Sequence, residues 1–149
     1  LDVSIQAQIV TLLRDLQRSR GLTYLFISHD LGVVEAMSDR VAVMYAGRVV
    51  EVLRAADLHS AAAHPYTTAL LEAMPVADPA VERERLRDAR TPLPEATGPG
   101  GKVSAALGVT GCAYRFRCPL ATAVCGERVP PLRPLAPDHD VACHHAEPV

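Results

Sequence analysis

A histidine stands just after an apolar stretch of the chain. Ser28 and His29 follow residues 22–27, a continuous apolar and β-rich run that predicts a strand buried on both faces of a parallel sheet. In open α/β sheets, ligands bind outside the carboxyl ends of the strands, so His29 stands where chemistry is usually done. A lone histidine is nevertheless more often a capping or core residue, and position alone does not decide between these roles.

The cysteines form a second group of residues that could do chemistry. All four lie in the C-terminal tail with the spacing C-x5-C-x6-C-x17-C, at Cys112, Cys118, Cys125 and Cys143. The paired C-x2-C knuckles that point strongly to zinc are missing. Four thiolates in a loop-rich tail can still ligate one metal centre, because closing the loop around a metal can replace a hydrophobic core. Zinc is one hypothesis for this centre, with a further ligand taken from the tail histidines His139, His144 and His145.

A long helix is expected before the apolar stretch. Apolar residues spaced by three and four predict an amphipathic helix over residues 3–20, with Gly21 as its C-cap. Asp2 or Ser4 is a suitable N-cap for this helix.

The elements after His29 alternate in type. The pattern predicts a helix over residues 31–37 and then a hairpin of residues 40–45 and 48–52 with a turn at Gly47. A further helix is expected from Pro65, which suits a first helical turn, to the residue before Pro75. This alternation of strands and helices implies an α/β layer.

Composition excludes several classes of protein. The chain has 149 residues, 49% of them apolar and 21% charged, which fits one globular domain rather than a disordered or fibrous chain. A net charge of -2 with no basic cluster argues against a nucleic-acid partner. No apolar run approaches the ~18–20 residues that cross a bilayer, and the N-terminus lacks the layout of a secretion signal.

The residues around His29 resemble the ATP-binding domain of ABC transporters. Asp2 before a helix, residues 27–30 after the predicted strand, and residues 38–51 are similar to the D-loop, the switch-histidine segment and the following hairpin of that domain. The resemblance implies that His29 hydrogen-bonds the γ-phosphate of ATP and helps to position the attacking water. It also implies that Asp2 touches the nucleotide site across a dimer interface.

The phosphate-binding parts of that family are not found in these residues. The closest match to the phosphate-loop pattern G-x-x-x-x-G-K-[ST] is residues 98–104, which lack the glycine five positions before Gly101 and have Val103 where a hydroxyl should bind Mg²⁺. In the family, Walker A, the LSGGQ signature and Walker B precede the segment that begins here with Leu1. We therefore expect a fragment of a longer subunit that uses ATP and Mg²⁺, and no ATP hydrolysis by the 149 residues alone.

A third segment resembles one branch of the ABC family. Residues 64–75 are similar to the H-P-Y-T-x-x-L-L-x-A-x-P stretch of oligopeptide and dipeptide importer subunits, some branches of which import nickel or glutathione. The resemblance implies permease transmembrane subunits and a second ATP-binding subunit, in a homodimer or heterodimer, as partners. A peptide-binding protein would be an indirect partner. The expected location is the cytoplasmic face of the plasma membrane, as a peripheral protein.

The importer branch also carries a similar set of cysteines. Its pattern G-C, R-C-P, C and A-C-H falls here on Cys112, Cys118, Cys125 and Cys143, within a C-terminal domain that binds a 4Fe-4S cluster in some members. The resemblance implies such a cluster, with zinc as the alternative, and disulfides are disfavoured in a cytosolic domain. Residues 114–116 replace a Phe-His-Pro run that is common in the family, a change that removes no ligand.

The expected fold class is therefore α/β, the C-terminal part of an ABC-type ATPase domain with an incomplete sheet, followed by a small irregular domain that contains the cysteines. The expected divisions are the ATPase part at 1–53, a helical connection at 54–75, a charged and Pro/Gly-rich linker at 76–110, and the cysteine-rich domain at 111–149. Two functions remain open. One is a fragment of a peptide-importer ATP-binding subunit, and the other is a free-standing metal- or iron-sulfur-binding regulatory module with an inactive ATPase remnant.

Overall fold

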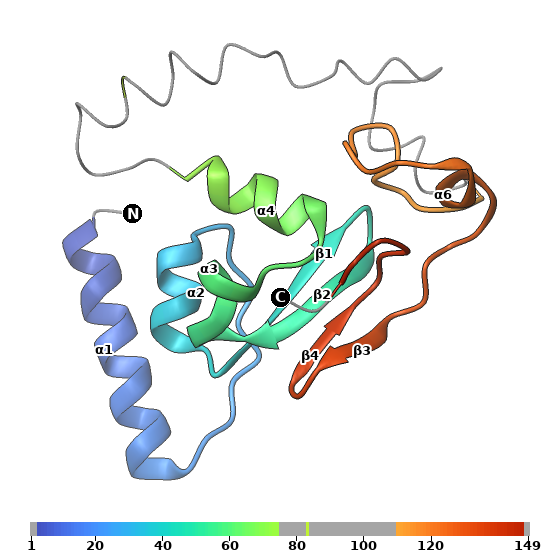
Figure 1. Ribbon diagram of the computed structural model, residues 1–149. Helices are drawn as coiled ribbons and strands as arrows, with labels where there is room; N and C mark the ends of the chain where they lie inside the picture. The colour runs from blue at the N-terminus through green and yellow to red at the C-terminus, as the bar shows by residue number, and fades with distance from the viewer. Residues whose placement is uncertain (1–2, 75–82, 84–109, 148–149) are drawn as a thin grey trace.

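The computed structural model describes residues 3–74, 83 and 110–147 (Figure 1). Its elements, in chain order, are α1 (Val3–Arg20), α2 (Leu31–Met37), β1 (Arg40–Tyr45), β2 (Arg48–Arg54), the 3₁₀ turn η1 (Ala55–Asp57), α3 (Leu58–Ala61), α4 (Pro65–Glu72), α6 (Ala123–Glu127), β3 (Arg133–Ala136) and β4 (His139–Val141). Asp2, Pro75 and most of the linker expected at 76–110 lie outside the described residues.

The predicted N-terminal helix is confirmed as α1. Gly21 adopts a φ of 62°, the left-handed conformation of a helix C-cap, and the N–H of Leu22 donates to the carbonyl of Gln17 at 3.2 Å. Two side chains connect the helix to the next segment: Gln6 Nε2 donates to Asp30 Oδ2 at 2.8 Å, and the guanidinium of Arg14 donates to a carbonyl of α2.

The expected strand over residues 22–27 is wrong. This segment forms no strand, and its side chains face solvent, with Leu25 94% exposed and Ile27 90% exposed. A strand is stable only when a neighbouring strand satisfies its backbone N–H and C=O groups, and no described strand pairs with residues 22–27. The apolar sequence therefore yields an exposed extended segment rather than a buried strand.

The predicted hairpin is confirmed as β1 and β2. Ala46 and Gly47 form a two-residue turn with φ of 48° and 75°, and Tyr45 pairs with Arg48 across it. Positive φ at both central positions is typical of the type I′ turn, which matches the twist of a hairpin and favours glycine.

The tail extends the same sheet. The strand order is β1-β2-β4-β3 and every described pairing is antiparallel, with Glu51 opposite Val141 and the N–H of Ala142 donating to the carbonyl of Val50 at 2.8 Å. The tail is thus less irregular than expected, since it holds α6, β3 and β4. Whether residues 111–149 form a domain of their own stays a prediction.

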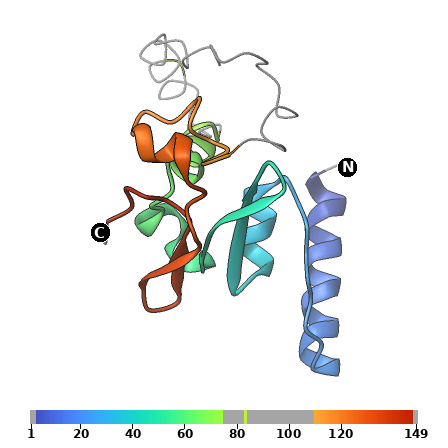
Figure 2. The same ribbon diagram turned by 90° about the vertical axis from the view of Figure 1, so that its right-hand side faces the viewer.

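The two ends of the described chain lie on opposite sides of the hairpin. Figure 2 shows α2 between the hairpin and α1, and the tail on the far side. One small core lies under the hairpin, where Val41, Val43, Val50 and Ala55 meet residues of α2 and α4. A second joins Val141, Cys143 and Ala146 to Ala63 and Leu135.

Candidate functional site

His29 is exposed, and its neighbour Asp30 holds the local backbone. Asp30 Oδ1 accepts from the N–H of Val33 at 3.2 Å and so caps α2. The hydrogen bond from Gln6, together with that from Val33, lowers the pKa of Asp30. His29 is therefore presented to solvent beside a fixed carboxylate, at the point where the exposed segment meets a capped helix. Asp30 was not among the site residues expected from the sequence, although an aspartate directly before a helix is a recognisable N-cap signal.

The predicted site residues do not all converge. Asp2 lies outside the described residues, and the cysteines belong to the tail, across the hairpin from α1 and α2 (Figure 2). The tail therefore forms a separate candidate site.

A glycine allows the first and third cysteines to meet. Gly111 adopts a φ of 91°, and a Cβ at this position would overlap the carbonyl oxygens of Cys125 and Gly126. The N–H of Cys112 donates to the carbonyl of Cys125 at 2.7 Å. This close approach requires a residue without a side chain, and it fixes Cys112 beside α6.

The four cysteines of the tail differ in burial. All are free, with Cys125 and Cys143 buried and Cys112 and Cys118 partly buried. Burial raises the pKa of Cys112, and the charges of Cys125 and Cys143 raise it further. The pKa of Cys118 is raised by burial and by the charges of the other three. A bound cation would favour the thiolate forms and so oppose the effect of burial.

Of the three tail histidines, His145 alone contacts a cysteine sulfur among the described residues. His145 Nε2 lies 3.5 Å from Cys125 Sγ and 2.9 Å from Thr122 Oγ1, and its backbone N–H donates to Cys143 Sγ at 3.4 Å. His144 Nε2 donates to the carbonyl of Arg128 at 3.0 Å instead. No group of three His, Cys, Asp or Glu side chains within the described ranges is placed to hold a single metal ion.

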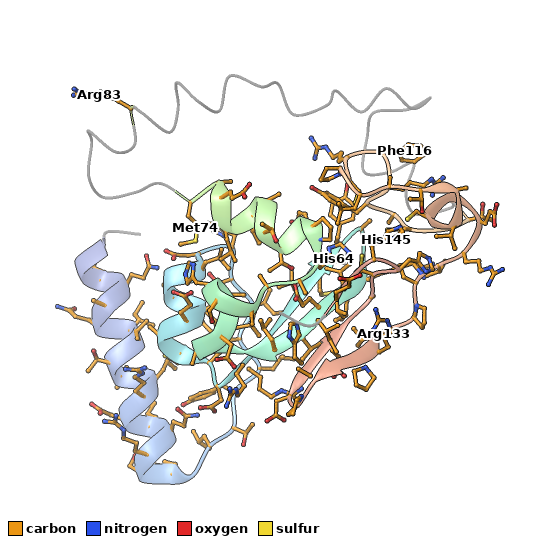
Figure 3. All side chains as sticks on the ribbon, viewed as in Figure 1. His64, Met74, Arg83, Phe116, Arg133 and His145 are labelled. Carbon is orange, nitrogen blue, oxygen red and sulfur yellow. The ribbon has the colours of Figure 1, made fainter. Side chains whose placement is uncertain are left out.

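The segment after Cys143 is held by an arginine of β3. Arg133 Nη2 donates to the carbonyl of Ala146 at 2.8 Å and to that of Cys143 at 3.5 Å. Figure 3 shows Arg133 on the tail strands, and His145 further along the tail. The last cysteine is therefore anchored to the sheet.

His64 is a structural residue. It is 1% exposed and caps α4, with Nδ1 accepting from the N–H of Tyr66 at 3.0 Å. Burial lowers the pKa of His64 to about 4, while the nearby charge of Glu51 acts in the opposite direction. The ring is therefore neutral at pH 7, as an acceptor at Nδ1 requires.

Tyrosines from three segments surround this cap. The ring of Tyr114 lies 5.1 Å from that of Tyr45, 5.5 Å from that of Tyr66 and 5.9 Å from that of His64, measured between centroids. Tyr45 and Tyr66 are 4.7 Å apart. Because Tyr114 lies between Cys112 and Cys118 in the sequence, these contacts attach the cysteine loop to both β1 and α4.

Glu51 is a buried residue that was not among the expected site residues. Its side chain is 0% exposed, and it accepts from the N–H of Ala63 at 2.7 Å, the N–H of His64 at 3.2 Å and His139 Nε2 at 2.7 Å. A glutamate between apolar residues of this strand was the available signal, because a buried carboxylate needs hydrogen-bond partners. Its partners lie too far along the chain to be identified by pattern.

Comparisons with known proteins place these features in a family. The family model described as the oligopeptide/dipeptide transporter C-terminal region matches residues 50–125, which include Glu51, α4 and three of the four cysteines. No described helix is long and apolar enough to span a membrane.

Curated relatives extend the similarity to nearly the whole chain. A Brucella ovis protein named a peptide import ATP-binding protein is 49% identical over 143 residues, which cover 96% of this chain and 42% of the relative. The oligopeptide transport ATP-binding protein AppF of Bacillus subtilis is 44% identical over 146 residues, covering 97% of this chain and 41% of AppF. The chain thus spans only about 42% of the length of such relatives.

Proposed function

Since the chain belongs to the family of oligopeptide/dipeptide transporter C-terminal regions, we propose that it is part of the ATP-binding subunit of an ABC importer of peptides. The observation that carries this proposal is the family match over residues 50–125, within a similarity that covers 96% of the chain. This continuous similarity favours the transporter subunit over a free-standing metal-binding module. The complete subunit would bind ATP and Mg²⁺ and couple hydrolysis to transport.

His29 is proposed to act on the γ-phosphate in the complete subunit. Its exposure supports this role, as does the capped turn that holds the backbone of Asp30. A neutral imidazole can donate one hydrogen bond to a phosphate oxygen or to the attacking water, and such positioning is most of the catalysis in phosphoryl transfer. Asp2 is proposed to contact the nucleotide site of a second ATP-binding subunit. The 149 residues alone are expected to hydrolyse no ATP, because they contain no phosphate loop.

Partners and location follow from the same proposal. The subunit would pair with a second ATP-binding subunit and drive permease transmembrane subunits, with a peptide-binding protein as an indirect partner. It would lie at the cytoplasmic face of the plasma membrane. The names of the relatives support peptides as cargo.

The cysteines are proposed to bind a 4Fe-4S cluster. The four cysteines at the importer spacing support this proposal, as does the burial of two of them, Cys125 and Cys143. In a cluster each thiolate binds a different iron atom, so its ligands lie further apart than those of one zinc ion. Cys112, Cys118, Cys125 and Cys143 would be the ligands. In the zinc alternative, His145 would be the additional ligand because it contacts Cys125 Sγ.

The transporter proposal is tested with the complete subunit and its permeases in vesicles. We expect His29→Ala to lower ATP hydrolysis and peptide uptake by about 100-fold or more, with ATP binding unchanged, because the lost contact forms on the reacting phosphate. His59→Ala is the matched control, since His59 is an exposed histidine that pairs with Glu35 and has no proposed contact with the nucleotide. Equal hydrolysis in the His29 and His59 variants would reject the proposed role.

A further inference from the structure

Glu51 joins three distant segments of the chain. It lies in β2 and accepts hydrogen bonds from the backbone just before α4, at Ala63 and His64, and from His139 in β4, which is 88 residues away. Burying a carboxylate costs free energy unless hydrogen bonds replace those that it made with water. The three donors to Glu51 therefore depend on one another, because the loss of one weakens the arrangement that holds the other two. Removing one donor leaves the charge under-satisfied rather than merely removing one contact.

The hydrogen bonds of Glu51 lie at the junction between the tail and the sheet. Glu51 is opposite Val141 in the sheet register, and the N–H of Ala142 donates to the carbonyl of Val50 at 2.8 Å. Cys143 is the next residue along the chain and packs in the same core as Val141. A displacement of Cys143 therefore acts directly on the strand that carries His139.

The cysteine loop has a second attachment at the same place. Tyr114 packs against Tyr45 and Tyr66, and the ring of His64 lies 5.9 Å from it. The loop that begins at Cys112 thus contacts Tyr66 at the start of α4, and the strand that leads to Cys143 packs against Ala63, just before that helix. A change in the tail can therefore reach the start of α4 through both contacts.

We propose that Glu51 is an internal latch that couples the start of α4 to the cysteine-bearing tail. A change at the cysteines loosens the backbone of Ala63 and His64, and a change at Glu51 exposes the buried cysteines. The coupling is reciprocal, because two sites that share one interaction energy must influence each other equally. This proposal goes beyond the assignment to a transporter subunit and requires no ATP hydrolysis. Either proposal can therefore be rejected while the other stands.

The test measures both directions in the full-length protein under reducing conditions. Hydrogen exchange reports the backbone N–H groups of Ala63 and His64, and mass spectrometry reports the rate of thiol alkylation at Cys125 and Cys143. We expect Glu51→Gln and His139→Leu each to raise both rates about tenfold. In the double variant the increases should not add, because both substitutions open the same latch.

The effect of the cysteines on the start of α4 is tested with a substitution of the half-buried Cys118. Cys118→Ser should raise exchange at Ala63 and His64 about tenfold, although no described hydrogen bond joins Cys118 to α4. In a His139→Leu background the same substitution should have little further effect. The latch is rejected if Cys118→Ser leaves these two amides unchanged, or if Glu51→Gln loosens them without exposing a cysteine.

Two controls separate the latch from general unfolding. Asp57→Asn removes a carboxylate that pairs with Arg54 outside the core, and it should alter neither rate. His139→Gln keeps a donor for Glu51 and should restore most of the protection lost in His139→Leu. An equal rise of exchange at Val33 and Val34 in α2 with Glu51→Gln would also overturn the proposal, since the carboxylate would then stabilise the whole fold rather than couple two parts.

Discussion

At the scale of single residues, the two histidines of interest have opposite environments. His29 is exposed beside a helix cap, whereas His64 is buried and accepts from the N–H of Tyr66. Because burial lowers the pKa of His64 to about 4, its ring stays neutral over the physiological range. The first residue of the His-Pro-Tyr motif therefore caps a helix and packs against the tail.

Acid should weaken the fold through His64. Between pH 6.5 and about 4 the unfolded chain binds a proton at this histidine and the folded chain does not, so stability falls as pH falls through that window. The loss attributable to His64 reaches about 3 kcal/mol at pH 4. In His64→Asn the amide oxygen keeps the cap but does not titrate, so this part of the pH dependence should disappear.

Urea unfolding of the full-length protein at pH 7 and pH 4.5 measures this difference. His59→Asn is the control, because it makes the same substitution at an exposed histidine. Identical acid sensitivity in wild type and His64→Asn would show that His64 is not the group responsible.

At the scale of elements, the cysteine loop depends on one backbone position. Gly111 has a φ of 91° and lies against the carbonyls of Cys125 and Gly126, which brings Cys112 to α6. A Cβ added at Gly126, within α6, would lie in open space. The two glycines therefore differ sharply in their tolerance of a side chain.

We expect Gly111→Ala to destabilise the protein by about 1–3 kcal/mol, through backbone strain and overlap with the two carbonyls. It should also make Cys112 more reactive toward alkylating reagents, because the hydrogen bond to Cys125 is lost. Gly126→Ala is the matched control and should be neutral or slightly stabilising, since alanine favours a helix. Thermal unfolding and thiol alkylation report the two effects, and equal behaviour of both variants would contradict the packing described.

At the scale of the whole molecule, the two ends of the described chain are attached to the sheet to very different degrees. The segment with α1 and residues 22–27 leaves large apolar side chains in solvent, whereas the tail is attached by strand pairing, by Tyr114 and by Glu51. The described core is small and concentrated near the hairpin and tail. A metal centre at the cysteines would therefore contribute substantially to the order of the tail.

Purification without oxygen tests that contribution. We expect the full-length protein to carry iron and sulfide with a broad visible absorbance band, and Cys118→Ser or Cys125→Ser to lose most of the iron and to lower the melting temperature. His145→Gln should retain the iron, because His145 is not a proposed cluster ligand. A colourless protein with zinc that is lost in His145→Gln would contradict the cluster and support the alternative.

Local signals explain which parts were predictable. Gly21 ends α1, Gly47 turns the hairpin and Pro65 opens α4, and each acts within a few residues of its own position. The strand expected at residues 22–27 failed because a strand depends on partners elsewhere. Likewise, β3 and β4 were not expected, since the tail lacks clear periodicity and pairs with a strand far along the chain.

Helices α1, α2 and α4, the hairpin, the family and the four thiols could all be read from the order of the amino acids, whereas η1 and α3 were not predicted. The exposure of residues 22–27, the burial of the His64 cap and the hold of Glu51 on His139 across 88 residues became visible only in the folded chain. The physical reason is the separation along the chain of the residues that interact. Turns, caps and helical periodicity are properties of neighbouring residues, whereas a buried carboxylate is satisfied by whichever donors the folded chain brings to it.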